Sequence, residues 1–294
     1  MKNKILLAVV VLLIPIVVIS FYHKKTNFYL EKKETKDYYV FLKDYNQKMK
    51  LNDYLVGVVA AEMPALFNDE ALKAQAIASR TFALYQMQHN NYVTLGDQSY
   101  ITNEEMHSKW QDNYDKYYHK ILQAVKDTGN LCIHYQNKLI KSYYFAISSG
   151  MTEDAKEVFN ESYDYLVPVN SSQDRNVNKF ETKIVLSTND FKNKLNLSTI
   201  ENINIIMDNQ NYVDQLIVDN QSFDGIQVRK LLNLRSASFN IKKDQDNIII
   251  TCYGYGHGVG MSQYGANELA KENYNYEQII KYYYKDVEIK EYNV

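Results

Sequence analysis

The chain has few cysteines, few prolines and no marked excess of charge of either sign. Two cysteines among 294 residues cannot form a disulfide scaffold for a chain of this length. Lysine and arginine number 33 against 35 aspartate and glutamate residues, so the formal net charge is -2. Binding to a phosphate backbone normally uses a basic excess, so nucleic acid is not an expected partner. A hydrophobic content of 46% is sufficient to build a core.

Glycine is also scarce, with 10 residues, yet five of them fall between Gly254 and Gly265. Their spacing matches neither a phosphate-binding loop nor the G-x-G-x-x-G pattern, so the usual nucleotide-binding motifs are excluded. Glycine at this density instead predicts close backbone approach or unusual backbone dihedrals. Two interpretations remain open: the floor of a groove that contacts an extended ligand, or a tight bend in which His257 is a packing residue.

The longest hydrophobic run lies at the start of the chain. Residues 5–22 are apolar except at Pro15 and Ser20, which is just long enough for a helix to cross a bilayer. A cleaved signal peptide is the alternative, although no convincing pair of small residues follows the run. We expect a single-pass cell-membrane anchor over residues 1–25 and a polar stalk over residues 26–37, with the globular part outside the cytoplasm.

Helical and strand patterns both follow the stalk, which predicts an α+β fold with two lobes around a substrate cleft. The catalytic lobe is expected to comprise residues 38–179 and 253–294, and a smaller strand-rich lobe residues 180–252. A hairpin is predicted from Leu131 to Phe145, turning at Gln136-Asn137-Lys138.

The first predicted helix of the catalytic lobe carries a carboxylate on its apolar face. Asn52 is expected to cap the helix and Pro64 follows its end. Helical spacing aligns Leu55, Val58, Val59 and Glu62. Burial and the negative end of the helix dipole both disfavour the ionised form of Glu62. A carboxyl group that keeps its proton is suited to protonating the leaving oxygen as a glycosidic bond breaks. The alternative is a partly exposed Glu62 paired with a lysine.

Two further helices have recognisable starts. Asn68 is expected to cap the second helix, which carries Gln75 and Arg80, and Ser262 is expected to cap a helix that contains Gln263.

The two cysteines suggest a metal site. Residues two apart on a strand point to the same face, so Cys132 and His134 could ligate one zinc ion, with Cys252 arriving from another strand. A disulfide between the two cysteines and burial of both thiols in the core are the alternatives.

Four blocks of sequence resemble the SpoIID/LytB family. The most specific of them contain Glu62-Met63-Pro64 and Gly256-His257-Gly258-Val259-Gly260-Met261-Ser262-Gln263. The others are residues 70–81 and 225–239. The resemblance covers nearly all of the chain after the stalk.

This resemblance implies a peptidoglycan lytic transglycosylase that acts in engulfment of the forespore during sporulation. Such an enzyme cleaves glycan strands stripped of their stem peptides, between N-acetylmuramic acid and N-acetylglucosamine, and leaves 1,6-anhydromuramoyl ends. The family's catalytic residue corresponds to Glu62, which acts first as an acid and then as a base. No second carboxylate is required, unlike in the usual two-carboxylate glycosidases.

The resemblance also implies that five polar residues line the cleft and bind sugar or support Glu62: Gln75, Arg80, Ser149, His257 and Gln263. Gln75 and Arg80 could equally be buried groups that tie helices together. The family often has a histidine where this chain has Ala146. That histidine is dispensable, is replaced by another group such as His134, or its loss weakens activity.

Partners are implied by the resemblance as well. They are the glycan strands of peptidoglycan, a peptidoglycan amidase like SpoIIP and a multi-spanning membrane protein like SpoIIM, between the mother-cell and forespore membranes. The alternative function is a non-catalytic glycan-binding module that activates an amidase, as LytB-type relatives do.

Overall fold

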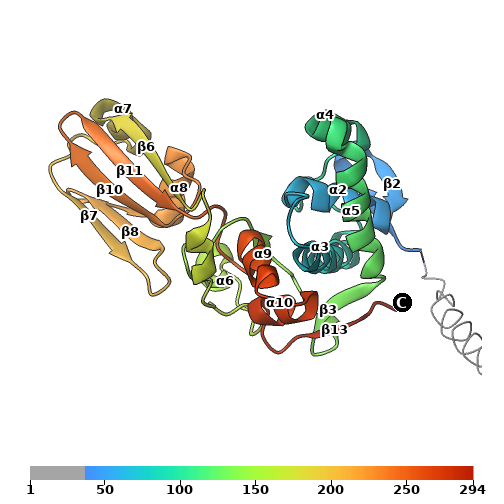
Figure 1. Cartoon of the computed structure of the whole chain (residues 1–294). Coiled ribbons are helices and arrows are strands. Elements are labelled where there is room, and N and C mark those ends of the chain that lie inside the picture. The colour runs from blue at the N-terminus through green and yellow to red at the C-terminus, as the bar shows by residue number, and fades with distance from the viewer. Residues whose placement is uncertain (1–36, 294) are drawn as a thin grey trace, which may run out of the picture. The chain divides into compact units, whose positions relative to one another are not determined.

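The computed structural model describes residues 37–293, and residues from 38 onward belong to one compact unit. It combines α-helices with several small β-sheets, which confirms the predicted α+β class (Figure 1). Among these residues no helix is long and apolar enough to cross a membrane. The predicted anchor at residues 1–25 lies outside the described residues, and so does the predicted stalk up to residue 36.

The α-helices are α2 (Leu51–Glu62), α3 (Asp69–Asn90), α4 (Asn103–Trp110), α5 (Tyr114–Asp127), α6 (Ala155–Phe159), α7 (Thr188–Leu195), α8 (Gly225–Leu232), α9 (Gln263–Lys271) and α10 (Tyr276–Tyr283). The strands are β1 (Tyr39–Leu42), β2 (Gln47–Lys50), β3 (Leu131–Tyr135), β4 (Lys138–Leu139), β5 (Tyr144–Phe145), β6 (Glu181–Ser187), β7 (Ile203–Met207), β8 (Val213–Val218), β9 (Gln221–Asp224), β10 (Phe239–Asp244), β11 (Asn247–Tyr253), β12 (Met261–Ser262) and β13 (Glu288–Glu291). They form sheets with the orders β1-β2, β13-β3-β4, β12-β5, β10-β11-β6 and β7-β8-β9.

Helix α2 ends at Glu62, as the sequence predicts, but it begins before the expected cap. Strand β2 runs directly into the helix, and the N–H of Leu51 donates to the carbonyl of Tyr38 at 2.8 Å. The chain therefore turns at Leu51, and Asn52 already lies inside the first helical turn. At the other end the N–H of Met63 donates to Val59, and the helix stops there.

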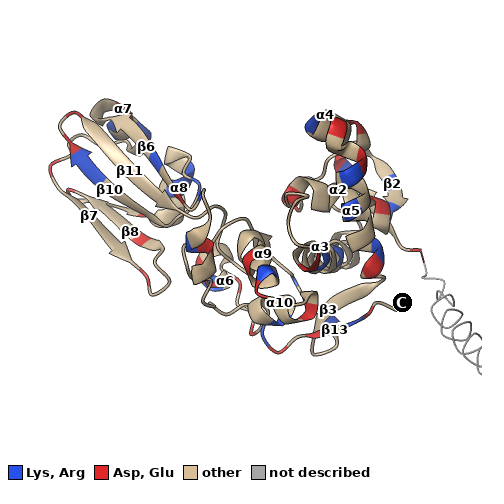
Figure 2. Ribbon diagram, in the orientation of Figure 1, with Lys and Arg blue, Asp and Glu red and all other residues tan. Residues whose placement is uncertain are grey.

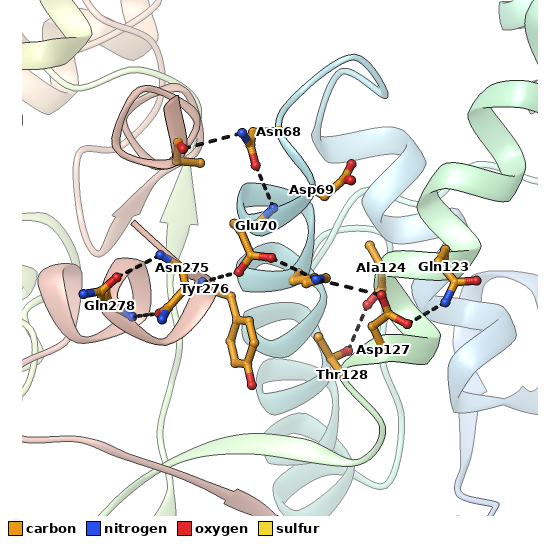
Figure 3. A network of polar contacts seen from close by, with 12 residues as sticks. Asn68, Asp69, Glu70, Gln123, Ala124, Asp127, Thr128, Asn275, Tyr276 and Gln278 are labelled. Carbon is orange, nitrogen blue, oxygen red and sulfur yellow. Dashed lines mark hydrogen bonds and ion pairs between the residues drawn. The ribbon is translucent and has the colours of Figure 1, made fainter. Parts of the chain in front are cut away.

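Helix α3 begins with the predicted Asn68 cap, whose side chain accepts a hydrogen bond from the N–H of Glu70. Figure 3 shows that this first turn is also bonded to the C-terminal helices. The N–H of Asn68 donates to Asn267 of α9 at 2.8 Å, and the Glu70 carboxylate accepts from the N–H of Tyr276, the first residue of α10, at 2.8 Å. Helix α3 thus joins segments that are about 200 residues apart in the sequence.

The predicted hairpin is shorter than expected. Strands β3 and β4 pair around Gln136 and Asn137, which both have positive φ, and this part of the prediction is confirmed. The second strand ends at Leu139 and does not continue to Phe145, because Tyr144 and Phe145 pair instead with β12 in parallel. This pairing brings the glycine-rich segment next to residues 143–145.

Buried side chains form two hydrophobic clusters. One joins residues from 40–169 with residues from 259–287, including the fully buried Tyr54 and Tyr283. The other consists of residues between 191 and 252. All members of the second cluster fall within the predicted smaller lobe, whose boundaries remain a prediction.

Acidic and basic residues are interspersed along the described elements, for example on α4 and α5 (Figure 2). This distribution agrees with the small net charge of the chain.

A buried carboxyl group lies between the segment after β5 and the loop that joins β7 and β8. Glu153 is 3% exposed, its N–H donates to Gly258, and its side chain accepts from the N–H of Asp154 at 2.7 Å. The Asp208 carboxylate, which accepts from two backbone N–H groups of its own loop, is its acidic neighbour. Burial above all, together with Asp208, raises the pKa of Glu153 to about 8, against the opposing effect of the Asp154 N–H.

Gly57 lies in the middle of α2 and packs against the loop before α4. A Cβ there would lie 2.3 Å from Cε2 of Tyr100 and 2.7 Å from the carbonyl oxygen of Ile101. Glycine to alanine in a helix usually stabilises by about 1 kcal/mol. We expect Gly57→Ala instead to lower the free energy of unfolding by about 1–3 kcal/mol through overpacking, measured by urea denaturation. Gly96→Ala is the control, because a Cβ at Gly96 would lie 3.5 Å from its nearest neighbour, the hydroxyl oxygen of Thr94. Equal stability of the two variants would contradict this packing.

The buried carboxyl group of Glu153 makes the stability of the protein depend on pH. The folded protein keeps the Glu153 proton up to about pH 8, whereas the unfolded chain releases it near its ordinary value of 4.5. This contribution to stability is therefore complete at low pH and is lost as pH rises. Glu153→Gln mimics the protonated group, so its stability relative to the original chain should rise by about 1–3 kcal/mol between about pH 5 and about pH 8. The control, Glu157→Gln, alters an exposed carboxylate. If the free energy of unfolding varies with pH in the same way for Glu153→Gln and the original chain, Glu153 does not keep its proton in the folded protein.

Candidate active site

A cavity of about 430 Å³ opens at the C-terminal end of α2. Polar and aromatic side chains line most of it, and they come from α2, α3, the loop before α4 and the chain around β5. Its lining residues are Glu62, Phe82, Gln86, Leu95, Gly96, Asp97, Gln98, Ser99, Lys141, Ser142, Tyr143, Tyr144, Phe159 and His257.

Glu62 is half-buried at the edge of this cavity, and both of its oxygens are held. The N–H of Ser99 donates to Oε1 at 2.9 Å, and the side-chain amide of Gln263 donates to Oε2 at 3.1 Å. Glu62 makes no ion pair with any described lysine, so the pairing considered as an alternative is not what positions it. Its carboxyl group is oriented by two neutral donors and faces open space.

Gln263 connects Glu62 to a buried chain of polar groups. Ser262 caps α9, as predicted, with its hydroxyl accepting from the N–H of Gly265, and Gln263 is the first residue of the helix. The Gln263 amide also makes a longer contact of 3.5 Å with Oε1 of Gln75, whose own amide donates to Ser79 at 2.9 Å. Gln75 is fully buried and does not line the cavity, so it acts on Glu62 through Gln263.

The loop that supplies the Ser99 N–H contains residues that the sequence analysis missed. The Asp97 carboxylate accepts from the Gln86 amide and, at 2.8 and 2.7 Å, from the N–H and hydroxyl of Thr94. The N–H of Ile101 donates to the carbonyl of Gly57 at 3.3 Å, which fastens the loop to α2. Thr94 and Asp97 are three residues apart, a spacing that suggests a side-chain-capped turn, but that pattern does not indicate a contact with Glu62.

His257 lines the cavity, but it is held as a packing residue. Its Nδ1 accepts from the N–H of Val259 at 3.1 Å, and its ring lies 5.2–5.9 Å from those of Tyr143, Phe145 and Phe159. Burial, and then the Arg229 cation, lower the pKa of His257 to about 4. The imidazole is therefore neutral near pH 7 and is poorly suited to donate a proton in catalysis.

The glycines around His257 permit close backbone contacts, as their density predicts. Gly260 has a φ of 81°, and a Cβ there would lie 2.0 Å from the carbonyl oxygen of Tyr143. This close approach lets β12 lie against β5 and places Gln263 within reach of Glu62.

Arg80 is fully buried and lies away from the cavity lining. Its guanidinium donates to the hydroxyl of Thr128 and to the carbonyls of Val125 and Leu131, all at 3.1–3.2 Å. This geometry favours the alternative in which Arg80 ties α3 to the end of α5 and the start of β3.

Ser149 and His134 also lie away from Glu62. Ser149 lines a different cavity and donates to the carbonyl of Gln210 at 3.2 Å. His134 lines a third cavity with Tyr85 and His89 and does not line the Glu62 cavity.

The three residues predicted to bind zinc are not brought together. Cys132 is buried in the first hydrophobic cluster and Cys252 in the second, and both are free thiols. Residues 37–293 contain no group of three His, Cys, Asp or Glu side chains that could hold a metal ion. Burial raises the pKa of the Cys132 thiol to about 12, as expected for a thiol in a hydrophobic core. These residues do not fit a zinc site, and of the three options the arrangement matches core burial.

Comparisons with known proteins agree with the motifs around Glu62. Residues 43–135 match the family model described as SpoIID, stage II sporulation protein. The chain is 34% identical over 267 residues to stage II sporulation protein D from Bacillus subtilis (strain 168), covering 83% of this chain and 76% of that protein. It is 35% identical over 260 residues to the protein of the same name from Bacillus amyloliquefaciens, covering 83% and 75%.

A more distant relative is the amidase enhancer from Bacillus subtilis (strain 168). It is 26% identical over 297 residues, an alignment that covers 81% of this chain and 40% of that protein. The similarity to the stage II sporulation proteins extends over most of both chains and includes the segment that carries Glu62, and it shows that this chain belongs to the SpoIID family.

Proposed function

We propose that this chain is a peptidoglycan lytic transglycosylase in which Glu62 is the catalytic acid and base. The observation that carries the proposal is a single carboxyl group at the edge of a cavity of about 430 Å³, with both oxygens oriented by hydrogen-bond donors. Family membership makes a sporulation role the natural setting.

The reaction needs one carboxyl group that is used twice. Protonated Glu62 donates its proton to the glycosidic oxygen as the bond between that oxygen and the anomeric carbon of N-acetylmuramic acid breaks. The resulting carboxylate then accepts the proton of the 6-hydroxyl of the same sugar, whose oxygen bonds to the anomeric carbon. The products are a 1,6-anhydromuramoyl end and a free hydroxyl on the departing N-acetylglucosamine. No water is consumed, and Glu62 finishes with its proton restored.

The cavity suits a mechanism without a second carboxylate. Asp97 is the other acidic residue in its lining, and its oxygens are engaged by Gln86 and Thr94. A retaining glycosidase would need a second carboxylate free to attack the sugar, and an inverting one would need a free base for water. Asp97 is better placed to hold the loop that carries Ser99.

The donors on Glu62 have a positioning role in this scheme. The N–H of Ser99 is part of the backbone and cannot rotate away, while the Gln263 amide is fixed at the first residue of α9. Each Glu62 oxygen keeps a lone pair for the proton that moves. An oriented carboxyl group needs little rearrangement to reach the glycosidic oxygen, and orientation is a large part of enzymatic rate enhancement.

The setting of the enzyme is also part of the proposal. The apolar run at residues 5–22 supports a membrane anchor with the globular part outside the cytoplasm. Stripped glycan strands are made by a peptidoglycan amidase, so we propose a SpoIIP-like amidase and a SpoIIM-like membrane protein as partners in forespore engulfment.

A second candidate function is a glycan-binding module that activates an amidase. The similarity to an amidase enhancer, at 26% identity, favours it. In this case the glycan would bind the same cavity, but Glu62 would make a contact to sugar and no bond would be broken. The two functions therefore differ in whether the activity is lost when the carboxyl group of Glu62 is replaced by a group that cannot donate a proton.

Glu62→Gln tests the choice. It keeps the size of the side chain and removes the acid, so formation of anhydromuramoyl ends from stripped glycan strands should fall by about a hundredfold or more, measured by mass spectrometry. The control, Glu272→Gln, alters an exposed carboxylate and should leave the rate unchanged.

Two outcomes would contradict the transglycosylase. Equal product formation by the original chain and Glu62→Gln would exclude Glu62 as the acid. If the original chain binds glycan and stimulates an amidase without forming products, and Glu62→Gln does the same, the activating module is the correct function.

A further inference from the structure

A second cavity of about 540 Å³ shares no lining residue with the Glu62 cavity. Half of its ten lining residues are aromatic or apolar, and the others are amides, hydroxyls and one cation. Its lining residues are Ser149, Arg175, Phe180, Ile205, Met207, Asn211, Ser238, Phe239, Asn240 and Tyr253.

The wall of this cavity combines aromatic rings with side chains that can form hydrogen bonds, a composition suited to binding a polar ligand. The rings of Phe180 and Tyr253 lie 5.8 Å apart at 42°. Asn211 contributes a side-chain amide, and the amide nitrogen of Asn240 remains a donor because its oxygen is the atom that accepts from Ile241. Pockets that bind small polar molecules typically combine an apolar wall with a few such groups.

Arg175 is the only cation in this lining, and it has no protein partner. Its side chain makes no ion pair or hydrogen bond with any other residue of the described range 37–293. Its guanidinium packs on the backbone of Gly150, where φ is 111° and a Cβ would lie 2.6 Å from Nε of Arg175. The glycine therefore makes room for the guanidinium at the cavity wall, where a planar cation can bind a carboxylate with two parallel hydrogen bonds.

The Glu62 cavity differs in charge from the Arg175 cavity. Glu62 and Asp97 are acidic, and the cation in that lining, Lys141, is already paired with Glu161 at 2.8 Å. Among the described residues, the lining of the second cavity contains no acidic residue and its guanidinium is unpaired, so this cavity is well suited to an anionic group on a bound ligand.

The two cavities are joined by one short piece of chain. Ser142, Tyr143 and Tyr144 line the first cavity, and Ser149 lines the second. Tyr144 and Ser149 are five residues apart in the sequence, so at most about 18 Å separate them even in a fully extended chain. The linings of the two cavities therefore approach each other to within a distance comparable with the length of a few sugar units.

We propose that the Arg175 cavity binds the carboxylate of a muramoyl unit in the glycan strand and so selects strands that have lost their stem peptides. Removal of a stem peptide by an amidase converts an amide of the lactyl group into a free carboxylate. Arg175 attracts that carboxylate, while Phe180 and Tyr253 support the sugar. This inference rests on the proposed function only in taking a glycan strand as the ligand, and it makes Arg175 a residue that determines specificity.

Binding in a non-cleaving background tests it. The Glu62→Gln chain and its Arg175→Met derivative are titrated calorimetrically with three ligands: stripped glycan strands, strands with intact stem peptides, and chitin oligosaccharides, which carry no carboxylate. Loss of a charge-assisted hydrogen bond should weaken binding of stripped strands about tenfold. Affinities for the other two ligands should stay within about twofold. Lys179→Met, which removes an exposed cation outside the lining, is the matched control.

Two results would overturn the inference. Equal weakening for all three ligands would make Arg175 a structural residue, and unchanged affinity for stripped strands would exclude it from binding. The test is independent of catalysis. If the original chain forms no anhydromuramoyl ends but Arg175→Met still weakens binding of stripped strands selectively, the transglycosylase proposal fails and this one stands.

Discussion

The site depends on the two hydrogen bonds that hold the Glu62 carboxyl group. Its donors belong to segments far apart in the sequence: Ser99 in the loop before α4, and Gln263 at the start of α9. A helix-end side chain without such partners would sample several rotamers. The docking of the loop on Gly57 and the pairing of β5 with β12 bring these two donors to the end of α2.

Helix α3 is the element through which these segments are aligned. Its first turn is bonded to α9 and α10, Gln75 in its second turn contacts Gln263, and Arg80 ties it to the end of α5. Polar groups this deeply buried are stable only when their hydrogen bonds are made. A shift of α3 would break several of these bonds together, so the relative positions of α2 and α9 are strongly constrained.

Local patterns in the sequence were enough to predict several features of the fold, whereas the catalytic role of Glu62 is a prediction from the family resemblance. Cap residues such as Asn68 and Ser262, the turn at Gln136-Asn137 and the end of α2 at Glu62 are all set by neighbouring residues, and the structure confirms them. Contacts between distant segments were not predictable in this way. The parallel pairing of β5 replaced an expected long hairpin, the Ser99 loop carried no signal, and Cys132 and Cys252 proved to belong to separate cores.

The central claim is that Glu62 assists attack of the 6-hydroxyl of N-acetylmuramic acid on the anomeric carbon of the same sugar. Glu62 does not activate water. Cleavage of stripped glycan strands in heavy-oxygen water measures this directly by mass spectrometry. The account predicts anhydromuramoyl ends without solvent oxygen, because the 6-hydroxyl of the sugar is the nucleophile. Reducing ends that carry heavy oxygen would contradict it, since they would show that water, and not the 6-hydroxyl, attacks the anomeric carbon.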